Sequence, residues 1–356
     1  MTRQIVNLKS TIVNLLEFPL VDQVKPLLEV RNLKKYFPIT QGFLRRTVGH
    51  VKAVDNVSLD VAAGETLGVV GESGCGKTTL GRTLVRLYEP TAGEAILNAN
   101  GKSLSVFDLE KEDMREFRRT AQIIFQDPYA SLNPRMNILE TVGEPLLVNG
   151  VAKGKELEER VAEIIVRVGL RVEHLQRFPH SFSGGQRQRI GVARALVVNP
   201  KLVVADEPVS ALDVSIQAQI LNLLEDLQEK LDLTYIFVSH DMSVVRYISD
   251  RIAVMYAGKL VELGTKDELL AHPRHPYTEL LLAAVPRTAK DARGQRVVAS
   301  GEPPDPANLP IGCVFHERCK YAKEICLNEE PTLQQAGLNH LASCHFADTL
   351  ELEGIS

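Results

Sequence analysis

The segment GESGCGKT, residues 71–78, is the feature of this sequence that most constrains its fold. It follows the apolar run GETLGVV and precedes TLGRTLVRLY, whose apolar residues have helical spacing. A strand, a glycine-rich loop and a helix in this order form a P-loop, in which backbone N–H groups converge on phosphates at the helix N-terminus. The sequence therefore predicts an α/β domain that binds phosphate groups.

The residue types in this loop suit a nucleoside triphosphate with its magnesium ion. The Lys77 ammonium supplies a positive charge for the phosphates, and the Thr78 hydroxyl is a ligand for Mg²⁺. A glycine turn without a ligand is the alternative, and the flanking strand and helix argue against it. We expect the nucleotide to be bound by Gly71, Ser73, Gly74, Gly76, Lys77, Thr78 and Thr79.

Two carboxylates end a second apolar run, LVVADE at residues 202–207. The carboxyl ends of parallel strands meet at one edge of a sheet, so this pair is expected near the phosphate loop. Asp206 suits Mg²⁺ binding through water, and Glu207 suits polarising the water that attacks the terminal phosphate. The order of the two motifs favours this interpretation over a merely solvated acidic pair.

Apolar, β-branched runs alternate with helix-like segments from about residue 28 to 270, as in an α/β domain with a largely parallel sheet. Buried strands are predicted at 66–70, 122–125, 202–205 and 234–239, and helices at 77–87, 154–169 and 214–231. The helix at 154–169 belongs to a predicted helical subdomain at about 127–195. Prolines interrupt the regular pattern after residue 270, so a boundary is expected near residue 271, with one large domain before it and an appendage after it.

Composition and charge narrow the class of protein. The 356 residues are 44% hydrophobic with a formal net charge of −4, so they can bury a large core and lack the basic excess of a nucleic-acid-binding protein. No apolar run reaches the roughly 18 residues needed to span a bilayer, so a transport role would require separate membrane subunits. The apolar start of the chain is interrupted by polar residues. We interpret residues 1–26 as a cytoplasmic extension, with a membrane-surface helix as the alternative.

A third motif, FSGGQRQR at residues 182–189, places a hydroxyl and two glycines at a helix N-terminus, which together form an anion site. The motif resembles the signature sequence of ABC ATPases, and Ser183, Gly184, Gly185 and Gln186 match its core. The resemblance implies that these residues bind the terminal phosphate of ATP held by a partner subunit. A plain helix cap is the alternative.

Further motifs follow in the order of the same family. Gln126 in IIFQDP resembles the Q-loop residue that ligates Mg²⁺ and couples the nucleotide to a membrane subunit, and His240 in IFVSHD resembles the switch histidine. The segment SALD resembles the D-loop, which implies that Asp213 helps to set the geometry of the opposite site. In LKKYFP, Phe37 is the expected adenine-stacking residue by its spacing; Tyr36 is the alternative, and a core position is an alternative for either.

The resemblance implies the fold of an ABC-type P-loop nucleotide-binding domain at 27–270, with a RecA-like core, an antiparallel β subdomain and a helical signature subdomain. It also implies a head-to-tail dimer in which each ATP lies between one P-loop and the other signature. Catalysis is then expected from Lys77, Gln126, Glu207 and His240.

Two longer stretches, at 126–135 and 207–224, resemble the peptide and nickel importer branch of the family, and HPYTELLLAAVP at 275–286 extends the resemblance into the C-terminal region of oligopeptide importers. This implies an ATPase at the cytoplasmic face of the membrane that powers import of dipeptides or oligopeptides. The sequence is most similar to the second of two paralogous ATPases. Expected partners are therefore a paralogous ATPase, two permeases and an extracytoplasmic solute-binding protein, and no nucleic acid. Nickel chelates, glutathione or another small solute are the alternative cargo.

Four of the five cysteines gather near the C-terminus, with the spacing C-x5-C-x6-C-x17-C. Cytoplasmic thiols stay reduced, so the cluster suggests metal ligation more than disulfides. The spacing is not that of a zinc-finger pair, and the C-terminal region that this one resembles is associated with [4Fe–4S] clusters in related importers. We expect such a cluster in the region 271–356, away from ATP and with a structural or redox-sensing role. Zn²⁺, with His316 or His345 as further ligands, and unligated thiols are the alternatives. The expected ligands are Cys313, Cys319, Cys326 and Cys344.

Three rival hypotheses remain. An ATPase of DNA repair or chromosome organisation needs a long coiled-coil insertion between P-loop and signature, and the interval here is short and without heptads. An ATPase of iron–sulfur assembly would fit the cysteines, but not the stretches at 126–135 and 275–286. A non-catalytic scaffold would be expected to lack Glu207, His240 or Ser183, and all three are present.

Overall fold

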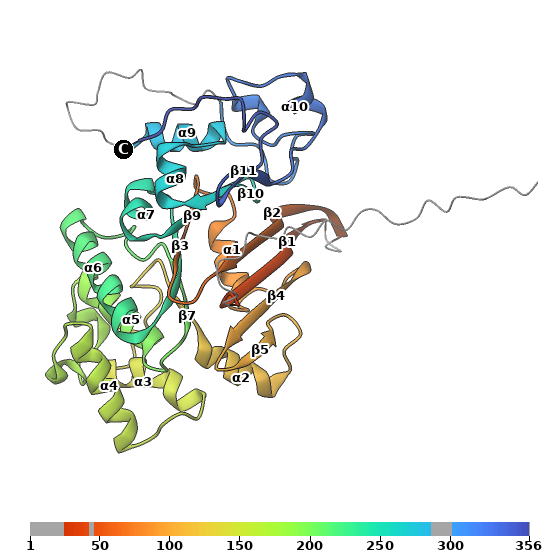
Figure 1. Cartoon of the computed structure of the whole chain (residues 1–356). Helices are drawn as coiled ribbons and strands as arrows, with labels where there is room; N and C mark the ends of the chain where they lie inside the picture. The colour runs from red at the N-terminus through yellow and green to blue at the C-terminus, as the bar shows by residue number, and fades with distance from the viewer. Residues whose placement is uncertain (1–24, 43–45, 286–300, 356) are drawn as a thin grey trace, which may run out of the picture.

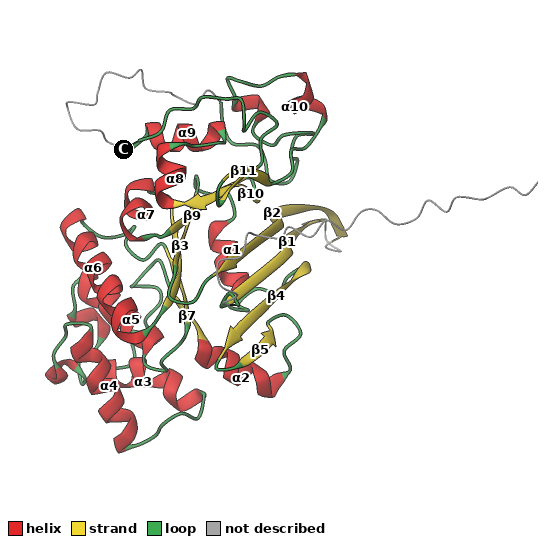
Figure 2. Ribbon diagram, viewed as in Figure 1, coloured by secondary structure: helices red, strands yellow, loops and turns green. Residues whose placement is uncertain are grey.

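The computed structural model describes residues 25–42, 46–285 and 301–355. Within these ranges the chain forms two β-sheets, with helices between them and around them (Figures 1 and 2). The predicted N-terminal extension, with its alternative of a membrane-surface helix, lies outside the described residues except for residues 25 and 26.

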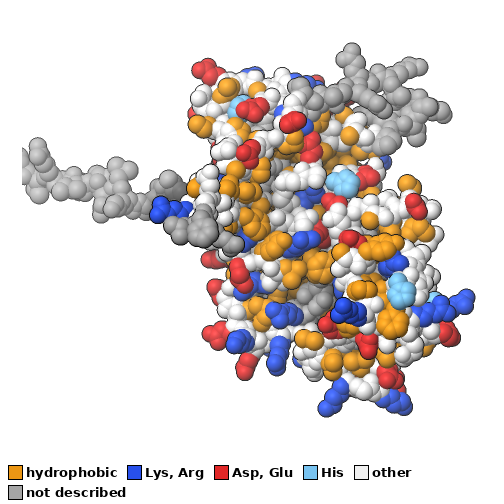
Figure 3. Space-filling view, turned by 180° about the vertical axis from the view of Figure 1, so that it is seen from behind, with side chains coloured by type: hydrophobic (Ala, Val, Ile, Leu, Met, Phe, Trp, Pro, Cys, Tyr) orange, Lys and Arg blue, Asp and Glu red, His pale blue; other side chains and the backbone are white. Residues whose placement is uncertain are grey.

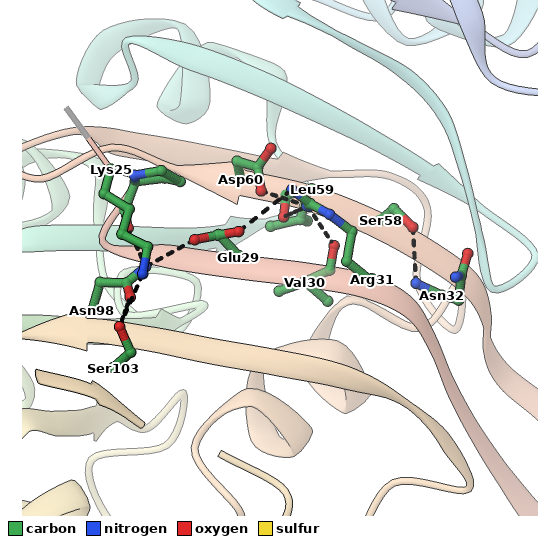
Figure 4. A network of polar contacts seen from close by, with 11 residues as sticks. Lys25, Glu29, Val30, Arg31, Asn32, Ser58, Leu59, Asp60, Asn98 and Ser103 are labelled. Carbon is green, nitrogen blue, oxygen red and sulfur yellow. Dashed lines mark hydrogen bonds and ion pairs between the residues drawn. The ribbon is translucent and has the colours of Figure 1, made fainter. Parts of the chain in front are cut away.

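The first sheet is antiparallel and, in the described part of the chain, has the strand order β2-β1-β4-β5. Its strands are β1 (Leu28–Gln41), β2 (Arg46–Val61), β4 (Ala92–Ala99) and β5 (Lys102–Ser105). Polar contacts cross it near solvent: Arg31 Nη1 lies 2.5 Å from Asp60 Oδ1, and Asn98 Nδ2 donates to Glu29 Oε1 at 2.9 Å (Figure 4). The Arg31 side chain is 46% exposed, so its ion pair contributes little and the buried apolar face carries most of the stability.

The second sheet is mixed and, among the described residues, has the order β11-β12-β10-β9-β3-β8-β7-β6. The strands β9, β3, β8, β7 and β6 run parallel to one another, which confirms the predicted parallel core. Every residue of β3, β7 and β8 is buried, as expected for parallel strands covered on both faces. Its strands are β3 (Thr66–Val70), β6 (Ala121–Ile124), β7 (Leu202–Asp206), β8 (Thr234–Ser239), β9 (Arg251–Tyr256), β10 (Lys259–Thr265), β11 (Gln334–Gly337) and β12 (His340–Ala342).

Helices cover both faces of this sheet. Helix α1 contacts strands of both sheets and lies between them, whereas α5, α6 and α7 lie on the other side of the parallel strands (Figure 1). The helices before residue 272 are α1 (Lys77–Leu84), α2 (Lys111–Thr120), α3 (Ile138–Val148), α4 (Lys155–Arg167), α5 (Gly184–Leu196), α6 (Val214–Leu231), α7 (Met242–Ile248) and α8 (Lys266–Ala271), with single 3-10 turns η1 (Val172–His174) and η2 (Pro179–Ser181). Helices α3, α4 and α5 pack on one another at the end of the molecule opposite the C-terminal region (Figure 1).

Most predicted elements are present, with small shifts at their ends. The strands at 66–70 and 234–239 and the helix at 214–231 have the predicted bounds. The helix predicted at 77–87 is shorter and ends at Leu84, because Arg86 adopts a left-handed backbone conformation with φ 56°. The strand predicted at 122–125 begins and ends one residue earlier.

The C-terminal region contains α9 (Pro276–Ala283), η3 (His316–Arg318) and α10 (Glu324–Asn328). It is less separate than the predicted appendage, because β12 pairs antiparallel with β10 and so extends the main sheet. The buried Glu262 carboxylate on β10 reinforces this junction, accepting a hydrogen bond from the His275 N–H at 2.9 Å and lying 2.6 Å from His340 Nε2. Glu262 and His340 are both fully buried, and the Glu262 carboxylate also accepts hydrogen bonds from the Arg274 N–H and the Thr278 hydroxyl.

Candidate active site

The parallel strands bring the P-loop, the acidic pair and His240 to one edge of the main sheet. Val70 at the end of β3 lies opposite Ser239 at the end of β8, and Asp206 at the end of β7 lies opposite Val238. The P-loop follows β3, the acidic pair ends β7, and His240 follows β8. The register of the strands therefore produces the convergence that the order of the motifs predicted.

The phosphate loop is held tightly against the first sheet and around its lysine. Gly76 is the N-cap of α1 with φ 107°, and a side chain there would overlap the Ala53 carbonyl oxygen. The Lys77 ammonium donates to the carbonyl oxygens of Gly71 at 2.7 Å and Glu72 at 2.9 Å, and the residue is 4% exposed. The loop thus keeps a positive charge at its centre, as phosphate binding requires.

Two of the predicted magnesium-binding residues, Thr78 and Asp206, also meet, whereas the third, Gln126, contacts Glu207. The Thr78 hydroxyl donates to Asp206 Oδ1 at 2.8 Å, which joins the start of α1 to the end of β7. Burial raises the pKa of the Asp206 carboxyl above its ordinary value, and the contacts with Thr78 and Arg82 oppose that shift. A hydroxyl beside a carboxylate is a donor set that suits Mg²⁺. Sequence reasoning missed Arg82, whose Nη2 lies 3.2 Å from Asp206 Oδ2; its position one helical turn after Thr78 is the signal that could have found it.

Glu207 receives contacts from two other predicted residues. Gln126 Nε2 donates to Glu207 Oε2 at 2.8 Å, and His240 Nδ1 lies 3.1 Å from the same oxygen. The backbone of Glu207 is left-handed, with φ 46°, and its N–H donates to the Val238 carbonyl at 3.0 Å. A non-glycine residue in this conformation is uncommon and strained, which suits a side chain that must be aimed at a reacting group.

The signature motif lies where α5 begins. The Ser183 hydroxyl accepts from the Gln186 N–H at 3.4 Å, and Gln186 Oε1 accepts from the Ser183 N–H at 3.1 Å, which is a capping box. Gly184 and Gly185 form the first helical residues; a Cβ on Gly185 would lie 2.6 Å from Ile216 of α6. The absence of a side chain at Gly185 therefore allows α5 and α6 to approach closely, and Asp213 occupies the N-cap position of α6.

The predicted adenine residue lies on β1. Phe37 makes an edge-on contact with Tyr88 at 5.5 Å between ring centroids, and the Lys35 ammonium lies 4.8 Å from its centroid. The alternative residue, Tyr36, donates its hydroxyl to Asp55 Oδ1 at 2.5 Å. Tyr36 therefore has a polar partner of its own, whereas Phe37 contacts Tyr88 and the Lys35 ammonium.

The four C-terminal cysteines line one pocket together with His275, Phe315, His316 and His345. Burial raises the pKa of Cys313 to about 12 and that of Cys344 to about 11. Among the described residues no group of three or more His, Cys, Asp or Glu side chains is placed to hold a metal ion. The structure thus gathers the four thiols without defining a metal site.

The C-terminal region reaches the phosphate loop, a contact that the sequence did not indicate. Arg318 forms a two-point ion pair with Glu72, the second residue of the P-loop, at 2.7 and 2.8 Å. The Tyr277 hydroxyl accepts from the Glu72 N–H at 2.7 Å. We expected the C-terminal region to lie away from ATP. It nevertheless contacts the loop that is expected to bind ATP.

Comparisons with known proteins identify the family of this chain. A model of the ABC transporter family matches residues 54–210, and a model of the oligopeptide/dipeptide transporter C-terminal region matches residues 261–326. The oligopeptide transport ATP-binding protein AppF of Bacillus subtilis is 53% identical over 323 residues, which cover 90% of this chain and 97% of that protein. The dipeptide transport ATP-binding protein DppF of Escherichia coli is 48% identical over 324 residues, covering 91% of this chain and 95% of the relative.

Solved structures of similar fold are also ATP-binding cassettes. The ATP-binding cassette MJ0796, in a dimeric post-hydrolysis state bound to ADP and Pi, superimposes with a TM-score of 0.58 at 29% identity and covers 67% of this chain and 98% of that one. No helix in the described ranges is long and apolar enough to cross a membrane. The chain belongs to the ABC ATPases, in the group of ATP-binding proteins of oligopeptide and dipeptide transporters.

Proposed function

We propose that this chain hydrolyses ATP to power the import of dipeptides or oligopeptides through separate permease subunits. The observation that carries the proposal is the meeting of Gln126 and His240 on one oxygen of Glu207, next to the contact between Thr78 and Asp206. The cargo is inferred from the relatives named as oligopeptide and dipeptide transport proteins, which match almost the whole chain.

In the proposed reaction Glu207 accepts a proton from the water whose oxygen attacks the γ-phosphorus. The bond from that phosphorus to the bridging oxygen breaks, which yields ADP and inorganic phosphate. Gln126 and His240 hold the Glu207 carboxylate in place, and Lys77 neutralises charge on the phosphates. Thr78 and Asp206 would hold Mg²⁺, which supplies further neutralisation of the phosphate oxygens when bound.

The signature motif belongs to a second site in this proposal. Ser183, Gly184, Gly185 and Gln186 would contact the terminal phosphate bound to a paralogous ATPase, in a head-to-tail dimer, and Asp213 would lie at the same junction. Support comes from their position at the N-terminus of α5, where the positive end of the helix dipole favours an anion. The solved cassette MJ0796 is itself described as a dimer. Phe37 would stack on the adenine of the nucleotide held by this chain's own P-loop.

The proposed location is the cytoplasmic face of the membrane, with two permeases and an extracytoplasmic solute-binding protein as partners. Basic and acidic side chains are interspersed on the face shown in Figure 3, in keeping with the small net charge and with our expectation of no nucleic-acid partner. We retain 27–270 as the nucleotide-binding domain and 271–356 as the C-terminal region. Purification from membranes with the permeases would support the placement, and recovery of the chain free of membrane proteins would contradict it.

For the four C-terminal cysteines we propose a [4Fe–4S] cluster. Support comes from the donor set, since four thiols line one pocket and the cluster takes one thiolate for each iron. Metal analysis and a visible spectrum after anaerobic purification test this assignment. Iron and sulfide in equal amounts support it, whereas zinc, or thiols without metal, would refute it.

ATP turnover tests the enzyme itself. The assembled complex should release phosphate from ATP, and the chain alone should do so slowly if the dimer completes each site. Uptake of labelled dipeptides or oligopeptides into vesicles then tests the cargo. Transport of nickel chelates or glutathione in place of peptides would keep the ATPase assignment and overturn the peptide assignment.

A further inference from the structure

The P-loop carries a negative charge close to the place where a triphosphate must bind. Glu72 is the second residue of the loop, and its carbonyl oxygen accepts a hydrogen bond from the Lys77 ammonium at 2.9 Å. Its backbone therefore belongs to the phosphate cradle, and its carboxylate would repel phosphate oxygens if it turned toward them. A device that holds this carboxylate away from the phosphates should strengthen nucleotide binding.

Arg318, from the C-terminal region, is placed to do this. Its Nη1 donates to Glu72 Oε2 at 2.7 Å and its Nη2 donates to Glu72 Oε1 at 2.8 Å, so the carboxylate is held by both oxygens. The Arg318 side chain is 6% exposed, and its Nη1 also lies 3.3 Å from the Tyr256 hydroxyl. A two-point pair of this kind fixes the orientation of the carboxylate and also neutralises its charge. A lysine could not reproduce this geometry.

The backbone of Glu72 is held from the same side. Its N–H donates to the hydroxyl of Tyr277, a fully buried residue of α9. Tyr277 packs on Tyr256 and Phe315 with ring centroids 4.6 and 5.4 Å away, and Phe315 lies three residues before Arg318. Side chain and backbone of one P-loop residue are thus fixed by a single rigid aromatic cluster, which ties the C-terminal region to the nucleotide loop.

We propose that Arg318 is a positioning residue for ATP binding, which holds the Glu72 carboxylate away from the triphosphate and sets the nucleotide affinity of the loop. The inference rests on the P-loop binding ATP, as proposed above. It assigns the C-terminal region a role in the ATPase site that is separate from metal binding by its cysteines.

Titration of the full-length chain with a fluorescent ATP analogue tests the proposal. Arg318→Met leaves Glu72 without its partner, so the Kd for the analogue should rise about tenfold, and the rise should shrink at high salt. The double variant Arg318→Met with Glu72→Gln removes the repelling charge and should restore most of the affinity. A purely structural role for Arg318 predicts no such rescue. If the double variant binds the analogue as weakly as Arg318→Met alone, the proposal is overturned.

Steady-state kinetics of ATP hydrolysis distinguish a positioning role of Arg318 from a catalytic one. In the assembled complex Arg318→Met should raise the KM for ATP and leave kcat nearly unchanged, because Glu207, Gln126 and His240 lie on other loops. A loss confined to kcat would contradict the inference. Should Arg318→Met fail to fold, Arg318→Gln removes the charge while keeping a hydrogen-bond donor, and it allows the same comparison.

A matched control comes from the other end of β3. Arg251 Nη1 forms an ion pair with Glu65 Oε1 at 3.1 Å, just before the strand begins. Arg251→Met should lower the unfolding temperature without changing the affinity for ATP. A wild-type chain that binds no ATP would refute the proposed function, whereas equal affinity in the wild-type chain and Arg318→Met would refute only the inference about Arg318.

Discussion

Replacing Glu207 by glutamine tests the proposed chemistry with little change in shape. Glutamine is isosteric with glutamate and keeps one oxygen able to accept from Gln126 Nε2, which lies 2.8 Å away in the wild-type chain. It cannot accept a proton from water at neutral pH. The left-handed backbone at this position, with φ 46°, is equally strained for both residues, so the fold should be preserved.

The magnitude follows from the loss of a general base. Proton transfer by a positioned side chain contributes about 10²- to 10⁴-fold in rate, which corresponds to roughly 3–5 kcal/mol of barrier. The contacts of Lys77 with the loop carbonyls and of Thr78 with Asp206 do not involve Glu207, so ATP binding should remain intact. We therefore expect normal nucleotide affinity and turnover lowered by at least about a hundredfold.

Phosphate release from the assembled complex, measured beside nucleotide affinity, is the assay. His240→Ala is the matched comparison, because it removes a neighbour of the carboxylate 3.1 Å away but leaves the carboxylate itself, and it should cost less than Glu207→Gln. Hydrolysis by Glu207→Gln within a few fold of the wild-type rate would refute the assignment of Glu207 as the base.

Three further predictions concern binding, stability and the cysteines. Lys77→Ala removes the charge at the centre of the loop and should weaken the affinity for ATP itself, as a titration would measure; unchanged affinity would contradict the proposed loop. Burial lowers the pKa of His275 to about 3, so the stability it contributes is present above its ordinary pKa of about 6.5 and is lost as the pH falls toward 3. Relative to His275→Asn, which can still accept from the Tyr277 N–H, the free energy of unfolding of the wild-type chain should fall by up to about 1.4 kcal/mol per pH unit in that window, and parallel curves would contradict this. Cys313→Ser should abolish the iron content while leaving ATP affinity within a few fold, and an unchanged iron content would exclude Cys313 as a ligand.

The parallel core could be predicted from the sequence because the residue patterns that mark its strands and helices are local and strong. Strands such as Thr234–Ser239 are short apolar runs ended by polar residues, and the helix Val214–Leu231 has sustained helical spacing. The resemblance to ABC ATPases assigned Gln126, Glu207 and His240 to one site, and each of them follows one of three neighbouring parallel strands, whose ends share one edge of the sheet.

The C-terminal contacts could not be predicted in the same way. Strand β12 has three residues and pairs with β10 across more than seventy positions of sequence, which leaves no periodicity to read. Arg318 and Glu72 are likewise brought together only by tertiary packing, and neither shows its partner in the local sequence. The left-handed backbone of Glu207 was also invisible, because glutamate carries no preference for that conformation.

Peptide uptake into vesicles that contain the assembled transporter tests the central claim most directly. The vesicles would hold this chain with the ATPase and permeases that co-purify with it, and the solute-binding protein and labelled peptide would be added on the opposite face. Our account predicts ATP-dependent accumulation of peptide with the wild-type chain and almost none with Glu207→Gln. Equal accumulation with both, or none with either while ATP is hydrolysed normally, would contradict the claim that ATP hydrolysis by this chain powers peptide import.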